Sequence, residues 1–324
     1  MKNNIIKILF TFGLILVLIG CNDSANEDDD FPSEDITVIV PNDAGGGTDI
    51  TARGLVEQTK DDLDTDIIVE NKPEGSGVAG LTEGAETDPD GYTLTMATVE
   101  LGIYPNLNRM PIDYQDFSPI VTAIADPASL IVPADAPYDT LEEFIDYAKE
   151  HPNLKVGNSG VGSIWHLAAA AIEDEFDLSF NHIPYDEGSA PAVSALAGGH
   201  VDAITVAPGN AKSQIDDGEF KVLGIMSDER LDSFEDVPTF EEEVGMDFTV
   251  QAWATLVAPK DTPDEIIDKL SDAFTDTVQS SEFKEYMANQ GIDSVEYGPE
   301  ESKEMMEEDH ELFKDLVKKL DIEE

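Results

Sequence analysis

Short apolar runs of strand length alternate along the chain with longer segments in which apolar and polar residues recur at helical spacing. Many of these runs carry valine and isoleucine, which favour extended backbone. They lie at 36–40, 67–70, 93–98, 120–125, 130–132, 155–158, 179–184, 202–206, 221–226 and 248–258. Strands that alternate with helices predict an α/β fold with mainly parallel sheets.

Polar residues before several helical segments mark where those helices are expected to begin. Thr140 with Glu143 forms the pattern of a capping box. Thr262 is placed to cap a later helix with Pro263 at its first position. The last helix is expected to start at Pro299 and to continue the alternation to the C-terminus.

The stretch 36–57 combines a strand, a glycine turn and the start of a helix. Thr48 and Asp49 are placed to cap a helix that runs to about Glu57. Such a turn leaves backbone N–H groups unpaired beside the positive end of the helix dipole, where an anion can bind. The candidate ligand contacts are Ala44, Gly45, Gly46, Gly47, Thr48 and Asp49. An ordinary connection between strand and helix shows the same glycines, so this turn alone does not define a site.

A second turn of the same kind follows the apolar run at 155–158. Its candidate ligand contacts are Ser159, Gly160, Val161, Gly162 and Ser163, and Ser163 can cap the next helix. Because it lies far along the chain from the first turn, it is expected in a second domain. Loops at the carboxyl ends of parallel strands line a crevice, so two such loops can close on an anion from both sides. Replacing Gly46 or Gly162 by proline is therefore expected to abolish binding.

Gly75, Gly77 and Gly80 match the glycine spacing of a dinucleotide-binding turn. The next strand, at 93–98, does not end in an acid placed for a ribose, although Glu100 lies just beyond it. The N-terminus, with Lys2 and Lys7 around an apolar run, predicts export, and an exported chain lacks a steady supply of such a cofactor. We therefore expect no cofactor.

The charge balance narrows the possible partners. The 324 residues include 70 acidic and 18 basic side chains, a formal charge of −52, and the acids are spread along the whole chain. A surface of this sign repels nucleic acid and anionic membranes. It is typical of proteins adapted to high salt, where repulsion between like charges is screened.

Two other functions are weighed against anion binding. Catalysis is disfavoured because the five histidines lack metal-ligand spacing and Gly157 to Val161 misses the last glycine of a nucleophile elbow. Calcium binding is suggested by the acidic surface, but no loop carries carboxylates at the spacing that calcium needs. We therefore expect neither an enzyme nor a metal site, with calcium binding kept as an alternative.

The N-terminus has the pattern of an export signal. Lys2 and Lys7 flank an apolar run at 5–19, which is too short for a spanning helix. The chain's single cysteine, Cys21, follows Leu18-Ile19-Gly20, an arrangement that resembles the bacterial lipoprotein processing site. The resemblance implies a signal peptide at 1–20, a lipid on Cys21 and an acidic tether at 21–33. A signal peptide with an incidental cysteine is the alternative.

From about Ile36 to its end the chain resembles the substrate-binding proteins of tripartite tricarboxylate transporters, the Bug/TctC-like extracytoplasmic solute receptors. The motifs that carry the resemblance share their order with the family. They are PNDAGGGTDITAR (41–53), VENKPEGSG (69–77), DPDGYTL (88–94), NSGVGSIWHL (158–167), PYDEGSAPAVSALAGGHVDA (184–203), DVPTFEE (236–242) and WATLVAPKDTP (253–263). Three positions depart from the family pattern: Asn42 replaces an aromatic residue, the loop 186–188 is acidic and longer, and Ala254 replaces a glycine.

The resemblance implies a two-lobed periplasmic-binding-protein (Venus flytrap) fold with crossover hinge strands. Lobe one would comprise 34–124 and 249–324, and lobe two 125–248. Both glycine turns would hold a ligand carboxylate, with Glu100 and Asp186 as further ligand contacts. The implied partners are a small organic carboxylate and membrane transporter subunits, for a monomer that touches the membrane through its lipid anchor only. A ligand-sensing receptor of a signalling system is the alternative function.

Overall fold

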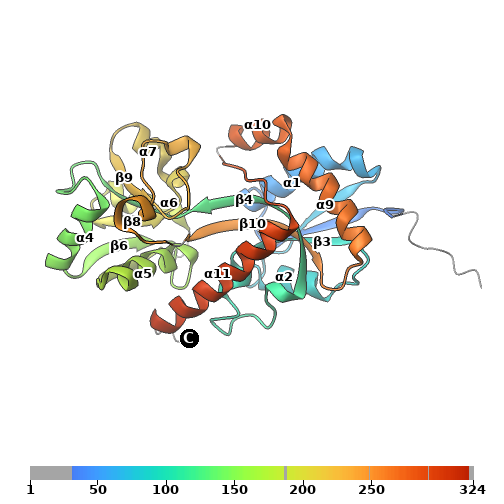
Figure 1. Ribbon diagram of the computed structural model, residues 1–324, viewed down its shortest axis with the longest axis horizontal. Helices are drawn as coiled ribbons and strands as arrows, with labels where there is room; N and C mark the ends of the chain where they lie inside the picture. Colours follow the sequence, from blue (N-terminus) through green and yellow to red (C-terminus); the bar gives the residue numbers. More distant parts are fainter. Residues whose placement is uncertain (1–30, 186–187, 248, 291, 321–324) are drawn as a thin grey trace, which may run out of the picture.

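Two five-stranded sheets form the two halves of an elongated molecule (Figure 1). The computed structural model describes residues 31–185, 188–247, 249–290 and 292–320. The predictions on the signal peptide and on Cys21 lie outside these residues. Within them no helix is long and apolar enough to cross a membrane.

The first sheet has the strand order β2-β1-β3-β10-β4. The chain contributes β1 (Ile36–Val40), β2 (Ile67–Asn71), β3 (Thr93–Thr98), β4 (Phe117–Pro127) and, from far later in sequence, β10 (Gln251–Pro259). Strands β1, β2 and β3 pair in parallel, whereas β10 pairs antiparallel with both β3 and β4. The carboxyl ends of β1, β2 and β3 therefore meet at one edge.

The second sheet repeats this plan with the order β7-β6-β8-β5-β9. It consists of β5 (Ser129–Pro133), β6 (Leu154–Asn158), β7 (Phe180–Pro184), β8 (Ala203–Val206) and β9 (Phe220–Ile225). Strand β6 pairs in parallel with β7 and β8, and β5 pairs antiparallel with β8 and β9. Each sheet is thus mixed, with a single reversed strand, and the expected two-lobed α/β fold is confirmed.

The helices cover the faces of the sheets, and the C-terminal helix extends from one half toward the other (Figure 1). They are α1 (Gly47–Leu63), α2 (Val78–Glu86), α3 (Glu100–Ile103), α4 (Leu141–Glu150), α5 (Ile164–Phe176), α6 (Ser189–Ala197), α7 (Lys212–Asp216), α8 (Phe240–Val244), α9 (Asp264–Gln279), α10 (Ser281–Asn289) and α11 (Pro299–Leu320). Helix α11 starts at Pro299 as expected. It packs against β4 and α3 of the first half and against α5 of the second.

Two helix starts differ from the expectation. Helix α1 begins at Gly47 with Gly46 as its N-cap, so Thr48 and Asp49 lie inside its first turn. Helix α9 begins at Asp264, and the Thr262 hydroxyl donates to the Pro259 carbonyl at 2.7 Å instead of capping the helix. The cap by Ser163 is confirmed, because its hydroxyl accepts from the His166 N–H at 3.2 Å.

Strands β4 and β10 run between the halves as an antiparallel pair, from Phe117 opposite Pro259 to Pro127 opposite Gln251. The chain passes from β4 directly into β5 of the second sheet and returns through β10 (Figure 1). These two strands are the crossover strands that a hinge requires.

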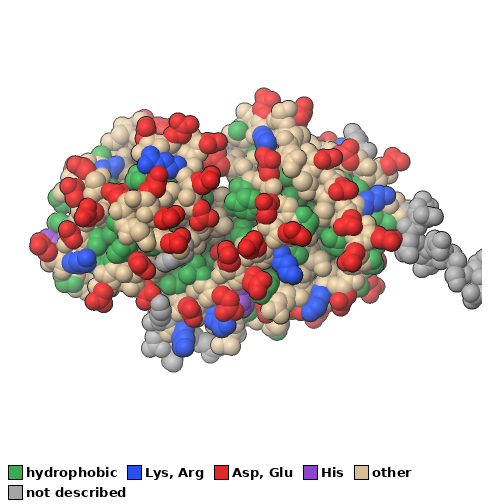
Figure 2. All heavy atoms as spheres, in the orientation of Figure 1, with side chains coloured by type: hydrophobic (Ala, Val, Ile, Leu, Met, Phe, Trp, Pro, Cys, Tyr) green, Lys and Arg blue, Asp and Glu red, His purple; other side chains and the backbone are tan. Residues whose placement is uncertain are grey.

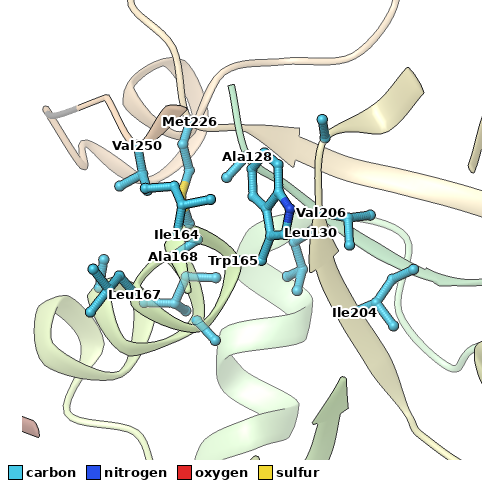
Figure 3. Packing of buried hydrophobic residues seen from close by; sticks show 14 of the residues in the cluster. Ala128, Leu130, Ile164, Trp165, Leu167, Ala168, Ile204, Val206, Met226 and Val250 are labelled. Atoms are coloured by element: carbon cyan, nitrogen blue, oxygen red, sulfur yellow. The ribbon is translucent and has the colours of Figure 1, made fainter. Parts of the chain in front are cut away.

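Apolar burial fixes how α5 lies on the second sheet (Figure 3). Trp165, Leu167 and Ala168 pack with Leu130 and Val206 of the sheet, and each is less than 10% exposed. Burying a large apolar side chain stabilises a fold by roughly 1.5–3 kcal/mol. The contact holds the N-terminus of α5, and hence the second glycine turn, in a fixed place.

Candidate functional site

The loops after β1, β2 and β3 meet at the carboxyl edge of the first sheet. The Asn71 side chain donates from Nδ2 to the Asn42 carbonyl at 3.0 Å, which ties the second loop to the first. Gly77 has φ of 90°, and a Cβ there would lie 2.8 Å from the Pro41 carbonyl oxygen. Only glycine therefore allows these two loops to pack this closely.

Asp49 holds the first glycine turn together. Its carboxylate is 2% exposed and accepts hydrogen bonds from the Gly45 N–H at 2.8 Å, from Asn71 Nδ2 at 2.9 Å and from Arg53 Nε at 3.0 Å. Burial acts to raise the pKa of Asp49, but these hydrogen bonds outweigh it and leave the pKa below its ordinary value. The side chain is fully engaged, so a ligand contact from this residue would come from its backbone N–H.

The first turn leaves a row of N–H groups facing outward. The Gly46 N–H donates to the Asp43 carbonyl at 3.3 Å. By contrast, the N–H groups of Gly47, Thr48 and Asp49, the first three of α1, have no acceptor among the described residues. Residues 44–47 are exposed, and Thr48 is half-buried. These three N–H groups are free donors at the positive end of the α1 dipole.

The second turn uses its glycine N–H groups internally. The Gly160 N–H donates to Asn158 Oδ1 at 3.1 Å, and the Gly162 N–H donates to His166 Nδ1 at 3.0 Å. The donors without an acceptor in the described chain are the N–H groups of Ser159, Val161, Ile164 and Trp165. Val161 is 52% exposed, and Ser163 is half-buried. Thus the donors offered to a ligand flank the two glycines.

His166 fixes the shape of the second turn. Because Nδ1 accepts the Gly162 N–H, the ring is neutral and carries its proton on Nε2. Burial, together with the adjacent His182 ring, lowers the pKa of His166 to about 4, while Glu173 acts in the opposite direction. No pattern in the sequence predicts this hydrogen bond.

The carboxyl edges of the two sheets face each other. A Cβ placed on Gly162 would lie 3.1 Å from Leu107 Cδ1 and 3.5 Å from Arg109 Nη1, both in the loop after α3 of the first half. Glu100, the first residue of α3, is half-buried at the same edge. Asp186 lies outside the described residues. The second turn therefore lies against the loop at 107–109 of the first half, where the crevice between the halves is expected.

Two cavities in the described chain are lined by residues outside the two glycine turns. One of about 660 Å³ borders α2, and one of about 920 Å³ lies between α11, the crossover strands and the loop at 227–231. Acidic side chains are spread over both halves on the face that Figure 2 shows, and they far outnumber the basic ones. No group of three or more His, Cys, Asp or Glu side chains in the described chain is arranged to hold a metal ion.

Two α/β halves joined by crossover strands, each with a helix that follows a glycine turn at the carboxyl edge of its sheet, are typical of a periplasmic-type solute-binding protein. The chain belongs to the tripartite tricarboxylate transporter family receptors, TctC, whose family model matches residues 51–322. The sequence-based family assignment is thereby confirmed.

Three solved structures are similar to this chain. A TctC solute-binding protein from Polaromonas is 38% identical, with a TM-score of 0.85 over 90% of this chain and 100% of that one. MatC from Rhodopseudomonas palustris, solved with bound malate, is 27% identical, with a TM-score of 0.69 over 89% of this chain and 100% of that one. Rpa4515 from R. palustris, solved with adipate, is 25% identical, with a TM-score of 0.72 over 89% of this chain and 98% of that one.

Proposed function

We propose that this receptor captures a small organic carboxylate outside the cytoplasmic membrane and delivers it to a transporter of the tripartite tricarboxylate type. The observation that carries the proposal is the set of unpaired N–H groups at the start of α1 and of α5, one set on each side of the crevice. Charge-assisted hydrogen bonds from such donors contribute about 1.5–3 kcal/mol each.

Both donor sets belong to helices that open directly after a parallel strand. Gly47 starts α1 seven residues after β1 ends at Val40, and Ile164 starts α5 six residues after β6 ends at Asn158. An anion between them would receive N–H groups and helix dipoles from both halves. Ligand binding would therefore favour the closed arrangement of the halves, and the closed surface would be what a transporter recognises.

The bound malate and adipate of the two R. palustris proteins support a carboxylate as the ligand class. The proposed location rests on the N-terminal pattern and on membership of a receptor family. Lipid attachment at Cys21 would keep the receptor at the outer face of the membrane. Globomycin, which blocks lipoprotein signal processing, should retain the precursor if this is right; unchanged processing would contradict it.

Replacing Gly47 by proline tests the proposed contact directly. Gly47 is the first residue of α1 and follows Gly46 in extended conformation, φ −78° and ψ 169°, which suits a residue before proline. The substitution removes one unpaired N–H while keeping the helix geometry. The control Gly47→Ala keeps the N–H, and its Cβ would lie 3.8 Å from Ile292 Cδ1, an ordinary contact.

We expect Gly47→Pro to weaken carboxylate binding by about tenfold or more, the loss of one charge-assisted hydrogen bond. Gly47→Ala should bind within about twofold of wild type. Isothermal titration against mono-, di- and tricarboxylates in molar salt gives both values, and circular dichroism checks the fold. Equal affinity in the proline and alanine variants would remove this N–H from the site.

A further inference from the structure

Arg109 is the one arginine of the described chain without a carboxylate partner. Arg53 and Arg230 are each held in an ion pair. The Arg109 guanidinium, in contrast, makes no ion pair and no hydrogen bond to any described residue, and the side chain is exposed. Acidic residues outnumber basic ones 70 to 18 in this chain, yet no described carboxylate pairs with the Arg109 guanidinium.

The position of this guanidinium is set by contacts across the crevice. Arg109 belongs to the first half, where its backbone N–H donates to the Tyr104 carbonyl at 2.9 Å. Its Nη1 and Cζ lie 3.5 and 4.0 Å from the place of a Gly162 Cβ, in the second half. Because Gly162 has no side chain, the guanidinium can lie against the second turn.

The charge of Arg109 acts on Tyr104 of the same loop region. Burial and the charge of Glu100 raise the pKa of Tyr104, while the charge of Arg109 and a hydrogen bond with Ser76 act to lower it. Arg109 thus shares the edge of the first sheet with Glu100, whose charge opposes an anion. The other cation at the turns, Arg53, is neutralised by Asp49 at 2.9 Å.

We propose that Arg109 binds a second carboxylate of the ligand, so that this receptor takes di- or tricarboxylates in preference to monocarboxylates. One carboxylate would occupy the N–H groups of the two turns, and the other would pair with the guanidinium beside Gly162. The planar fork of arginine matches a carboxylate with two parallel hydrogen bonds, which lysine cannot form. This inference rests on the proposed function and adds the ligand class to it.

Ligands that differ by a single carboxylate separate the role proposed for Arg109 from carboxylate binding in general. Adipate and hexanoate share a carbon chain and differ by one carboxylate, as do malate and 2-hydroxybutyrate. Calorimetric titration would compare wild type with Arg109→Gln, Arg109→Lys and the control Lys260→Gln. Lys260 is exposed and follows β10 at Pro259, the end paired with the start of β4, so its loss changes the net charge equally away from the crevice.

Wild type should bind a dicarboxylate at least tenfold more tightly than its monocarboxylate analogue. Arg109→Gln should lose that preference through weaker dicarboxylate binding, with monocarboxylate affinity changed less than twofold. Arg109→Lys should lose part of the preference for the dicarboxylate, and Lys260→Gln should keep all of it. Circular dichroism and melting temperature confirm that the variants fold.

Three results would overturn the assignment. The first is a wild type that binds both members of each ligand pair equally well. The second is an Arg109→Gln variant that keeps the preference for the dicarboxylate. The third is an Arg109→Gln variant that binds both the dicarboxylate and the monocarboxylate more weakly by the same factor, which would mean a role in closure. If wild type binds none of the mono-, di- and tricarboxylates tested, the proposed function fails and the inference falls with it. If only monocarboxylates bind, the function stands and the inference fails.

Discussion

Replacing Asp309 by asparagine should stabilise the fold at neutral and alkaline pH. Asp309 lies on α11, is 5% exposed, and accepts a hydrogen bond from Trp253 Nε1 on the crossover strand β10 at 2.6 Å. Burial raises the pKa of Asp309 from 3.8 to about 8, although the Trp253 bond acts to lower it. Asparagine keeps an acceptor oxygen for Trp253 and removes the ionisation.

The raised pKa of Asp309 determines how the stability of the fold changes with pH. A carboxyl group with a pKa raised by folding binds its proton more tightly in the native state than in the unfolded state. Its contribution to stability is complete below pH 3.8 and is lost as the pH rises toward 8. At about 1.4 kcal/mol per pH unit, the wild type loses on the order of 3–4 kcal/mol from this group between about pH 5 and pH 8.

Urea unfolding at a series of pH values measures the difference between variant and wild type. The free energy of unfolding of Asp309→Asn, relative to wild type, should increase between pH 5 and pH 8 by an amount of that order. Glu307→Gln removes an exposed carboxylate from the same helix and should show no such increase. A difference that does not depend on pH would refute a buried carboxyl with a raised pKa.

Two further predictions concern the crevice. Carboxylate affinity should hold or rise as salt is added to molar levels. Salt at about 1 M shortens the Debye length to about 3 Å, so it screens repulsion from the acidic surface more than it weakens short hydrogen bonds from N–H groups. A steep loss of affinity with added salt, measured by calorimetry, would contradict this. His166→Ala should weaken binding by about tenfold, because the Gly162 N–H loses its acceptor. Since folding lowers the pKa of His166 to about 4, the stability that the neutral ring contributes is complete above 6.5 and is lost as the pH falls toward 4. Wild-type affinity measured by calorimetry should hold down to about pH 5 and fall as the pH approaches 4, where the folded His166 ring gains its proton. Loss of affinity on raising the pH would contradict the assignment.

Local patterns in the sequence predicted the elements well. Apolar runs such as Ile36–Val40 gave the strands, and Ser163 and Pro299 marked helix starts that the structure contains. Helix α1 runs beyond the expected Glu57 to Leu63, because buried side chains continue along that helix face. Periodicity and capping depend on near neighbours, which a sequence shows directly.

Contacts made over long sequence separations were not predictable in the same way. Asn71 binds the Asp49 carboxylate, and Arg109 lies beside Gly162, because packing of whole elements brings these residues together. The acceptor of the Gly162 N–H, in contrast, is only four residues away, yet a buried histidine in a helix does not show which ring nitrogen it uses. The glycine spacing located both turns without showing which N–H groups remain unpaired.

The two turns are held in ways that keep negative charge away from an anionic ligand. The first depends on a buried carboxylate, Asp49, whose charge is balanced by Arg53. The second depends on His166, which is neutral because its pKa is far below 7. Neither Asp49, paired with Arg53, nor the neutral His166 therefore repels an anion at the turns, although the formal charge of the chain is −52. The main-chain donors are therefore opposed only by the acidic surface, which salt screens, and the unpaired charge of Arg109 is the local electrostatic feature that distinguishes one carboxylate ligand from another.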